Sequence, residues 1–563
     1  MVTYDTSAVN KGPSTKEETI ILGVLRDFSS LQNERSTWNG HCEDVADVIL
    51  PSHSNTFYFG SMNTPGEKKT QQQVDATGML ALSRFAAICD SLLTPRNMIW
   101  HGLEGEEGYL KKDRQTRLWC ETATKILFKY RYATVSNFAA QNQAIFQSLG
   151  AFGTGVLFID KFFDIRRARP QLRYKAIPMG EIYLTDNHQG LYNGFIRIIR
   201  LTAAQMAEVK EWEGKLPPQV LTALEQNSQT KFVTLQRVKP RTDYDPDAID
   251  ARGTPYYSCY VSMEGKCLLS EGGYYSFPIA ASRYQQAPGE RDGRGVAMDV
   301  LPSLRTLNAE KRTFLKQGHR AADPVLLTYD DGLMSLSLKP GALNKGGWSS
   351  DGKPLVGTLP SGEIQITLEM MQEEKSIIQD AFLTSLFQVI FDNPSMTATQ
   401  VIEIVNQKGI LIAPTVGRQQ GEYLGPMIDR ELDLLASMRV LPEMPPLMRE
   451  ARGAYSVNYT SPLAKAMRAG EAAGFFRTLE GVKEIVAITG DLAPLDNFNF
   501  DVAIPDIADI QSVPTSWMSS PQEIEGKRRN RAEGAARQEQ IQAAPAAAAM
   551  MKAEAAAAQA GTR

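Results

Sequence analysis

Residues 289–320 read GERDGRGVAMDVLPSLRTLNAEKRTFLKQGHR, and this stretch decides how the chain is organised. After its glycines, apolar residues recur at the spacing of an amphipathic helix, which we expect over residues 296–320. The apolar arc of that helix consists of Val296, Ala297, Val300, Leu304, Leu307, Phe314 and Leu315.

The roughly opposite arc of the same helix is basic. Arg305, Arg312, Lys316 and Arg320 follow one another at spacings of seven, four and four residues, and we call these four residues the basic stripe. Such a stripe is commonly a solvated face, and it is also a pattern with which a helix meets nucleic-acid phosphates. From the helix alone, both interpretations stay open.

Upstream of this helix, the N-terminal third of the chain is predicted to be helix-rich. Helical spacing extends over residues 16–50 and stops at Pro51, and a second apolar stripe over residues 74–93 stops at Thr94 and Pro95. Two further helical segments are expected within residues 115–149.

From Gly150 the pattern alternates between apolar and polar residues, which is typical of antiparallel strands. Helix is expected again over residues 202–226, with Thr202 as its N-cap and an interruption at Pro217 and Pro218. Strands follow over residues 230–283, so the sequence predicts a small β module between two helices. The predicted class is a helix-rich α+β fold.

Downstream, residues 335–362 are rich in Gly, Ser, Pro and Lys and are predicted to form a long loop. Long helices are expected from about 363 to 391 and from 397 to 441, the second with possible breaks at Pro414 and Pro426. Beyond Ser519 the chain ends in an Ala-rich run that we expect to be helical or disordered rather than part of a globular core.

The composition excludes several classes of protein. With 563 residues and 43% hydrophobic residues the chain should form several structural regions, and 60 Lys+Arg against 64 Asp+Glu argue against a sequence-reading DNA binder. Five cysteines without CxxC spacing favour reduced, mostly buried thiols and folding in a cytoplasm. The polar N-terminus lacks the order of a secretory signal, and no apolar run approaches the roughly 20 residues of a membrane span.

Two short segments approach known ligand-binding motifs. GWSSDGKP, from Gly347, lacks only the Ser or Thr of a phosphate-binding loop, but Pro354 stands there and no convincing buried strand precedes the segment. DYDPDAID, from Asp243, resembles the start of a calcium loop, but Ala248 replaces the turn glycine and Thr254 the bidentate Glu, so we interpret it as a solvated turn.

No other pattern indicates catalysis or metal binding. The glycines of GAFGTG precede a strand instead of a helix, which predicts a helix stop and a tight turn rather than a dinucleotide site. The five histidines never pair at metal-ligand spacing, and no nucleophile elbow occurs. We therefore expect no catalytic residues, no metal, no cofactor and no enzymatic activity.

The order of several segments resembles the head-to-tail connector, or portal, family of short-tailed bacteriophages. ERSTWNGHCEDVADVILP (34–51), DATGMLALSRFAAICDSLLTPRNMIW (75–100) and SNFAAQNQAIFQSLGAFGTGVLFID (136–160) resemble successive blocks of that family. GERDGRGVAMDVLPSLRTLNAEKRT (289–313) resembles its glycine-rich signature, with Asp292 where Tyr is usual. TATQVIEI (397–404), with Gln400 in place of an acidic residue, and YTSPLAKAMR (459–468) continue the match. The resemblance extends over roughly residues 20–530.

The resemblance implies a portal fold assembled as a dodecameric ring at one capsid vertex. Under this plan the regions are an N-terminal wing part (1–200), a first stem helix (201–228), a clip made of the β module (229–291), a second stem helix (292–321), a channel loop region (322–362), long wing helices (363–445), a crown (446–515) and a C-terminal helical barrel or tail (516–563).

The implied function is a conduit for genome packaging and ejection in a virion whose portal vertex is assembled in the host cytoplasm. The implied partners are other copies of the chain, major capsid and scaffolding proteins, the terminase large subunit during packaging, then tail adaptor or nozzle proteins, and double-stranded DNA bound without sequence preference. We expect no membrane insertion.

In a ring, twelve copies of the helix at 296–320 would present rings of positive charge to passing DNA, which carries about one negative charge per 1.7 Å. We therefore treat the basic stripe (Arg305, Arg312, Lys316, Arg320), with Lys345 and Lys353 of the loop, as candidate DNA-channel residues. The alternative is that the stripe packs on acidic residues of a neighbouring subunit, for instance Glu208, Glu211 or Glu213.

Two rival functions remain to be tested. Another phage head-tail ring protein, such as an adaptor or tail tube, is the nearer alternative, and the length and the helix–β–helix order count against it. A packaging ATPase or nuclease is the other, and the defective phosphate loop counts against it.

Overall fold

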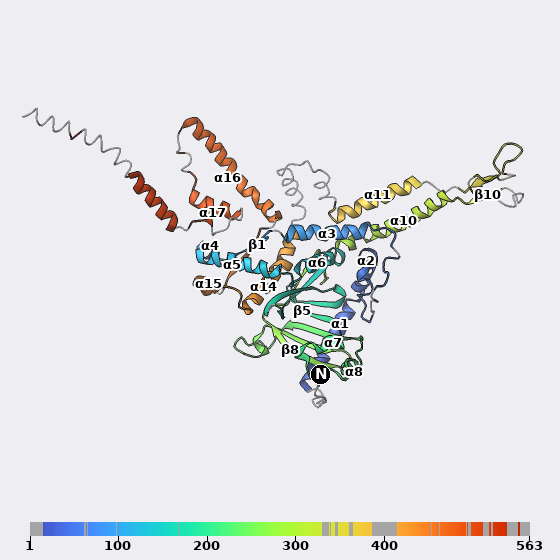
Figure 1. Ribbon diagram of the computed structural model, residues 1–563, viewed down its shortest axis with the longest axis horizontal. Coiled ribbons are helices and arrows are strands. Elements are labelled where there is room, and N and C mark those ends of the chain that lie inside the picture. Colours follow the sequence, from blue (N-terminus) through green and yellow to red (C-terminus); the bar gives the residue numbers. More distant parts are fainter. Residues whose placement is uncertain are drawn as a thin grey trace, which may run out of the picture. The chain divides into compact units, whose positions relative to one another are not determined.

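The computed structural model describes residues 15–60, 64, 66–71, 73–96, 98–166, 168–328, 337, 339, 341–343, 347–359, 364–384, 414–451, 453–460, 462–490, 493, 497–510, 517–519, 522–536 and 550–551 (Figure 1). The chain forms two compact units. The first consists of residues 1–100, 127–440 and 461–466, and the second of residues 101–126, 441–460 and 467–563.

The predicted N-terminal helices are confirmed. Helix α2 ends just before Pro51 and α3 just before Thr94, as the sequence predicted, because proline limits the backbone of the residue before it and cannot continue a helix. Gly153 adopts a left-handed conformation with φ of 75° and ends α6, which confirms the helix stop expected in GAFGTG. The helices are α1 (Thr15–Glu34), α2 (Ser36–Ile49), α3 (Thr77–Leu93), α5 (Arg114–Arg131) and α6 (Phe138–Phe152).

Two antiparallel sheets follow in the first unit. One has the order β3-β2-β9, and the other, of five strands, has the order β4-β5-β6-β7-β8. Sequential strands pair as neighbours in the larger sheet. The strands are β2 (Thr154–Asp164), β3 (Arg169–Ala176), β4 (Ile182–Asp186), β5 (Tyr192–Thr202), β6 (Lys231–Pro240), β7 (Tyr256–Ser262), β8 (Cys267–Tyr274) and β9 (Ile279–Arg283).

The helix expected over residues 202–226 has its predicted cap and its predicted interruption at Pro217 and Pro218, but it is also broken before them, so residues 201–228 contain no long helix. Thr202 does cap a helix, since its side chain accepts from the backbone N–H of Gln205 and the Gln205 side chain accepts in return, but α7 covers only Ala203–Ala207. A 3-10 turn at Lys210–Trp212 and helix α8 (Pro218–Glu225) complete the link between β5 and β6. The proline pair 217–218 and Gly214, at φ of 75°, prevent one continuous helix.

The β module is also not an insertion between two helices. Strands β6, β7 and β8 extend a sheet that β4 and β5 begin upstream of residue 229, and β9 pairs with β2 in the other sheet. Sequence patterns identified the strands correctly, but strand partners are fixed by long-range packing that periodicity does not record.

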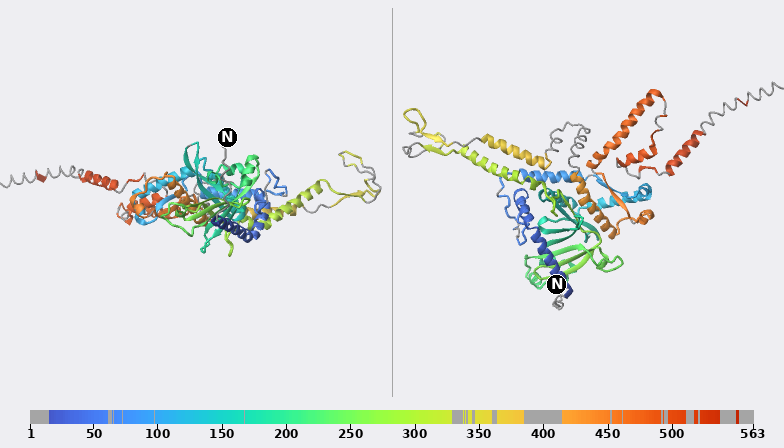
Figure 2. Two further views of the ribbon diagram at one scale, coloured as in Figure 1. Left: turned by 90° about the horizontal axis from the view of Figure 1, so that it is seen from below. Right: turned by 180° about the vertical axis from the view of Figure 1, so that it is seen from behind.

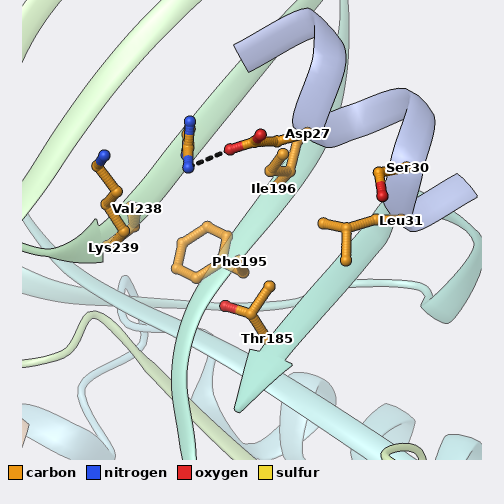
Figure 3. Close-up of a pocket in the computed structure, with 9 residues that line it drawn as sticks. Asp27, Ser30, Leu31, Thr185, Phe195, Ile196, Val238 and Lys239 are labelled. Atoms are coloured by element: carbon orange, nitrogen blue, oxygen red, sulfur yellow. Dashed lines mark ion pairs between the residues drawn. The ribbon is translucent and has the colours of Figure 1, made fainter. Parts of the chain in front are cut away.

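Helix α1 covers one face of the five-stranded sheet. Phe28 of α1 is 1% exposed and meets Tyr183 of β4 edge to face, with ring centroids 5.4 Å apart. Beside it, Asp27 forms an ion pair with Arg237 of β6 at a small cavity of about 190 Å³ that is also lined by Phe195 and Lys239 (Figure 3). The N-terminal helix is thus part of the core.

The helix that follows the glycine-rich signature is α10 (Leu301–Ala322), preceded by the short α9 (Val296–Asp299). A two-stranded hairpin of β10 (Leu326–Thr328) and β11 (Val356–Thr358) follows, and then α11 (Ile364–Ala381). Two views show α10 and α11 side by side, with the hairpin at their far end (Figures 1 and 2). The predicted loop at 335–362 therefore contains at least one strand in its described part.

The long helix expected from 363 is shorter than predicted, and residues 385–413 lie outside the described residues. From residue 414 the chain is helical through α14 (Gly425–Ser437) with no break at Pro426. A π-helical turn over Gln420–Leu424 ends just before Gly425, and Pro426 lies in the first turn of α14, where a residue without an N–H is tolerated.

The second unit contains a pairing that the sequence did not predict. Strand β1 (His101–Gly105) pairs with β12 (Tyr455–Tyr459), and Trp119 donates to the carbonyl of Pro442 over 3.0 Å. The remaining described elements of that part of the chain are α4 (Gly108–Lys112), α15 (Pro446–Glu450), α16 (Pro462–Thr489), α17 (Phe500–Ile510) and a helical stretch at 522–536 within the predicted tail.

Candidate functional site

The start of the α10 segment is fixed by close packing between two glycine-rich loops. A Cβ atom on Gly153 would lie 2.2 Å from the carbonyl carbon of Arg294, and one on Gly295 would lie 2.6 Å from the nitrogen of Gly153. Across the same contact, the N–H of Gly293 donates to the hydroxyl of Thr154 over 2.8 Å. We call this contact between Gly153 and residues 293–295 the glycine seam. Only glycine allows main chains to approach so closely.

The first half of α10 is anchored in the core. Leu301, Leu304 and Leu307 are buried, and no later residue of α10 is. The side chain of Asn308 accepts from the N–H of Val74 over 2.8 Å. Beyond this point the helix leaves the core, and its second half has α11 as its principal neighbour among the described elements.

Helix α11 runs antiparallel to α10. The hydroxyl of Thr367, near the start of α11, donates to Gln317, near the end of α10, over 3.1 Å. Met371, Ile378 and Phe382 are buried, so the inner end of α11 also joins the core. We call the paired helices α10 and α11 the helix pair.

The structure places all four residues of the basic stripe on one exposed face of α10. Arg305 forms an ion pair with Asp44 of α2 over 3.1 Å, with both side chains about half exposed. The charge of Arg305 is therefore partly balanced within its own subunit, whereas Lys316 and Arg320 have no ion pair with a described residue. No sequence pattern indicated Asp44 as a partner, because the two residues lie on helices separated by the whole β region.

The other predicted residues that the structure describes lie on other elements than α10. Lys353 lies in a tight turn in which Trp348 bridges Pro354, and Lys345 lies outside the described residues. Glu208, Glu211 and Glu213, the suggested acidic partners, lie in the link between β5 and β6 rather than on a long helix.

The two ligand-like motifs have ordinary structural roles. In GWSSDGKP the N–H of Ser349 donates to the carbonyl of Lys353 over 2.8 Å and closes a turn inside the bridge between Trp348 and Pro354, whereas a phosphate-binding loop would connect a strand to a helix. In DYDPDAID the carboxylate of Asp250 accepts from the N–H of Arg252 over 2.9 Å, and Asp243 faces Arg241 over 3.6 Å. Within the described ranges, no three His, Cys, Asp or Glu side chains gather as metal ligands would.

A buried carboxyl next to the glycine seam was not predicted as a special residue. Asp292 is 7% exposed, and one of its carboxylate oxygens has no hydrogen-bond partner among the described residues. Burial raises the pKa of Asp292, and the nearby positive charges of Arg35 and Arg291 oppose that rise. The only hint in the sequence was that Asp replaces the Tyr that is usual at this place in the resembled signature.

All five cysteines are free, and Cys42, Cys120 and Cys259 are buried, in agreement with the reduced thiols predicted. Burial raises the pKa of the Cys120 thiol to about 12, so this side chain behaves as a small apolar group. Among the helices that the structure describes, none combines the length and apolar character needed to cross a bilayer.

Comparison with known proteins gives a consistent result over almost the whole chain. Residues 23–518 match the family described as bacteriophage head to tail connecting protein. The chain is 25% identical over 522 residues to the probable portal protein of Bordetella phage BPP-1, with 91% of each chain covered. It is also 25% identical over 533 residues to the portal protein of Salmonella phage epsilon15, again with 91% of each covered. The chain therefore belongs to the bacteriophage head to tail connecting protein family.

Proposed function

We propose that this protein is a phage portal protein, a dodecameric ring at one capsid vertex through which the genome is packaged and ejected. The observation that carries the proposal is the family match over residues 23–518, together with two portal proteins that align along 91% of their length. Both relatives are named portal proteins, which favours this role over that of an adaptor or tail-tube protein.

Within this proposal, the stem, clip and wing are assigned to other residues than the sequence suggested. A stem requires two long helices joined by a small β element, and residues 201–228 do not supply one of them. The helix pair with the β10–β11 hairpin has that order, so we assign the stem to α10 and α11 and the clip to the segment between them. The two sheets then belong to the wing. The crown at 446–515 and the C-terminal barrel or tail at 516–563 keep their predicted positions.

The exposed part of the basic stripe is the surface of the stem that we propose to face DNA. Arg312, Lys316 and Arg320 lie beyond the core-anchored half of α10, and Lys345 and Lys353 remain candidates in the clip segment. Contacts to phosphates suit a conduit, because they are independent of base sequence and allow DNA to move. Arg305 contributes less, since Asp44 already pairs with it.

The expected partners follow from the position of a portal in the virion. Capsid and scaffolding proteins would surround the ring, the terminase would dock on the clip during packaging, and tail adaptor or nozzle proteins would later occupy the same surface. Because the motor belongs to the terminase, the purified protein should hydrolyse no ATP.

Negative-stain imaging of the purified protein tests the proposal most directly. Closed rings of about twelve subunits with a hole of about 20 Å or more, wide enough for a duplex, are expected. Monomers or open filaments at moderate salt, or measurable ATP turnover, would contradict the portal role. Closed rings that do not bind the packaging ATPase would favour an adaptor.

A further inference from the structure

One side of the helix pair carries three carboxylates that lack cationic partners among the described residues. Glu310 of α10 lies near Glu374 and Glu373 of α11, and one carboxylate oxygen of Glu310 and one of Glu374 is buried without a hydrogen bond. Partial burial and the two neighbouring carboxylates raise the pKa of Glu310. These like charges repel within the subunit, so this surface is incomplete in a single copy.

The same side of α11 exposes apolar residues. Ile366, Met370 and Ile377 share a face with Glu373, because positions separated by four, seven and eleven residues lie in one row along a helix. Their exposed fractions are 53%, 50% and 44%. We call the surface formed by these three residues with Glu310, Glu373 and Glu374 the acidic flank.

The other side of the helix pair has the opposite charge. Lys311 directly follows Glu310, and Lys375 directly follows Glu374. Successive side chains of a helix point about 100° apart, so each lysine lies on the other side of the contact between α10 and α11 from the glutamate before it. Because the helices are antiparallel, both lysines then lie on the same side of the pair. Leu315 and Leu368 share their rows at spacings of four and seven and are 41% and 42% exposed. We call these four residues the basic flank.

We propose that neighbouring copies of this chain pack helix pair against helix pair, with the acidic flank of one copy against the basic flank of the next. This inference rests on the proposed ring. Two different, complementary surfaces on opposite sides of one element form a heterologous contact, which closes into a ring when the rotation between copies is right. The contact would cover the exposed apolar side chains of both flanks and provide Glu310 and Glu374 with cations.

The packing also assigns the exposed face of α10. Arg305, Arg312 and Lys316 of the basic stripe lie on the side of α10 opposite Glu310. They would form a basic wall of the assembled tube. The packing therefore favours the interpretation of the basic stripe as a wall surface over its interpretation as a subunit contact.

Two charge-reversal variants test the contact. In the first, Glu310→Lys with Glu374→Lys makes both flanks basic, and in the second, Lys311→Glu with Lys375→Glu makes both flanks acidic. Each variant alone should lose the ring peak in size-exclusion chromatography with light scattering, because every contact would oppose like charges. An equimolar mixture should recover closed rings that contain the two variants in equal numbers, as native mass spectrometry would show.

A matched control changes the same kind of residue outside the helix pair. Asp247→Lys with Glu271→Lys reverses two exposed charges, one before β7 and one on β8, and should leave assembly intact. Far-UV circular dichroism of each separated variant checks that the subunits are folded. Folded variants that form rings by themselves would overturn the flank contact, and so would folded variants that fail to assemble when mixed. Absence of rings from the wild-type protein would instead overturn the proposed function.

Discussion

Arg131 and Glu431, 300 residues apart in the chain, form an ion pair in which neither side chain has any exposed surface. The guanidinium also lies over the Trp100 ring, 4.7 Å from its centroid, and Tyr174 donates its hydroxyl to Glu431 over 2.6 Å. Burial, followed by the charge of Glu431, raises the pKa of the Tyr174 phenol well above its usual value. Both residues belong to the first unit, Arg131 as the last residue of α5 and Glu431 as part of α14.

Removal of one member of this pair should be far more costly than removal of both. Glu431→Leu leaves a buried guanidinium without its counter-charge and should lower the free energy of unfolding by about 3–5 kcal/mol, whereas Arg131→Met with Glu431→Leu should recover much of that loss. Urea denaturation monitored by circular dichroism measures the free energy of unfolding of the single and the double variant. Arg449→Met, which breaks an exposed pair with Glu443, serves as control and should change stability by less than about 1 kcal/mol. Equal losses for the single and double variants would show that the pair itself stabilises the fold.

Gly153→Ala should prevent correct folding of the first unit. The residue combines φ of 75° with a space in which a Cβ atom would lie 2.2 Å from main chain of the glycine seam. Gly190→Ala is the matched control, because Gly190 has φ of 76° and a methyl group there would meet nothing within 4 Å. Soluble yield and proteolytic resistance should fall sharply for Gly153→Ala and little for Gly190→Ala. Similar behaviour of both variants would mean that backbone strain, and not the seam, is responsible.

Asp292→Asn should make the protein more stable at neutral pH. Because the pKa of Asp292 is raised in the folded state, its contribution to stability is fully present below the unfolded value near 3.8 and is lost as the pH rises through the folded value. The amide removes this loss, so the variant should be more stable than the wild type at pH 7, and the gain should disappear towards pH 4. Asp47→Asn, on the exposed face of α2, should show no such pH-dependent gain. A variant that is less stable at pH 7 would indicate that Arg35 and Arg291 need the carboxylate.

Arg312→Gln with Lys316→Gln should leave rings intact and weaken DNA retention. The substitutions remove positive charge from the proposed DNA-facing wall, and each lost phosphate contact should also reduce the salt dependence of binding to duplex DNA. Filter binding of purified rings at several salt concentrations measures this slope. The control is Lys210→Gln with Lys231→Gln, in the link between β5 and β6 and at the start of β6. It should match the wild type in ring formation and in the salt dependence of DNA binding. Loss of rings would place the stripe at a subunit contact, and unchanged binding would place it on the outer wall.

The sequence predicted local structure well and long-range structure poorly. Helix ends at Pro51 and Gly153 and the cap at Thr202 depend on neighbouring residues, and all three are present as predicted. The length of the helix expected over 202–226 was overestimated. Its apolar residues belong to two short helices and a turn that pack into a small core with β8, and their spacing in the sequence resembles that of one longer helix.

For the candidate site, the basic stripe could be identified from α10 alone, because its spacing is periodic. The ion pair of Arg305 with Asp44, the unpaired oxygen of Asp292 and the carboxylates facing Glu310 could not, since each depends on a residue that folding brings from elsewhere. Our proposal moves the stem for the same reason: only the structure identifies α11 as the partner of α10.

The glycine seam has a consequence for how such a protein can change over time. The start of the α10 segment is held mainly by main chain against main chain, with the Thr154 hydroxyl as a side-chain contact at the seam. Substitutions along the helix pair can therefore alter the charge that it displays without altering where it points. Bore and surface chemistry become separate properties, so a ring could acquire a new docking partner while its aperture for DNA stays the same.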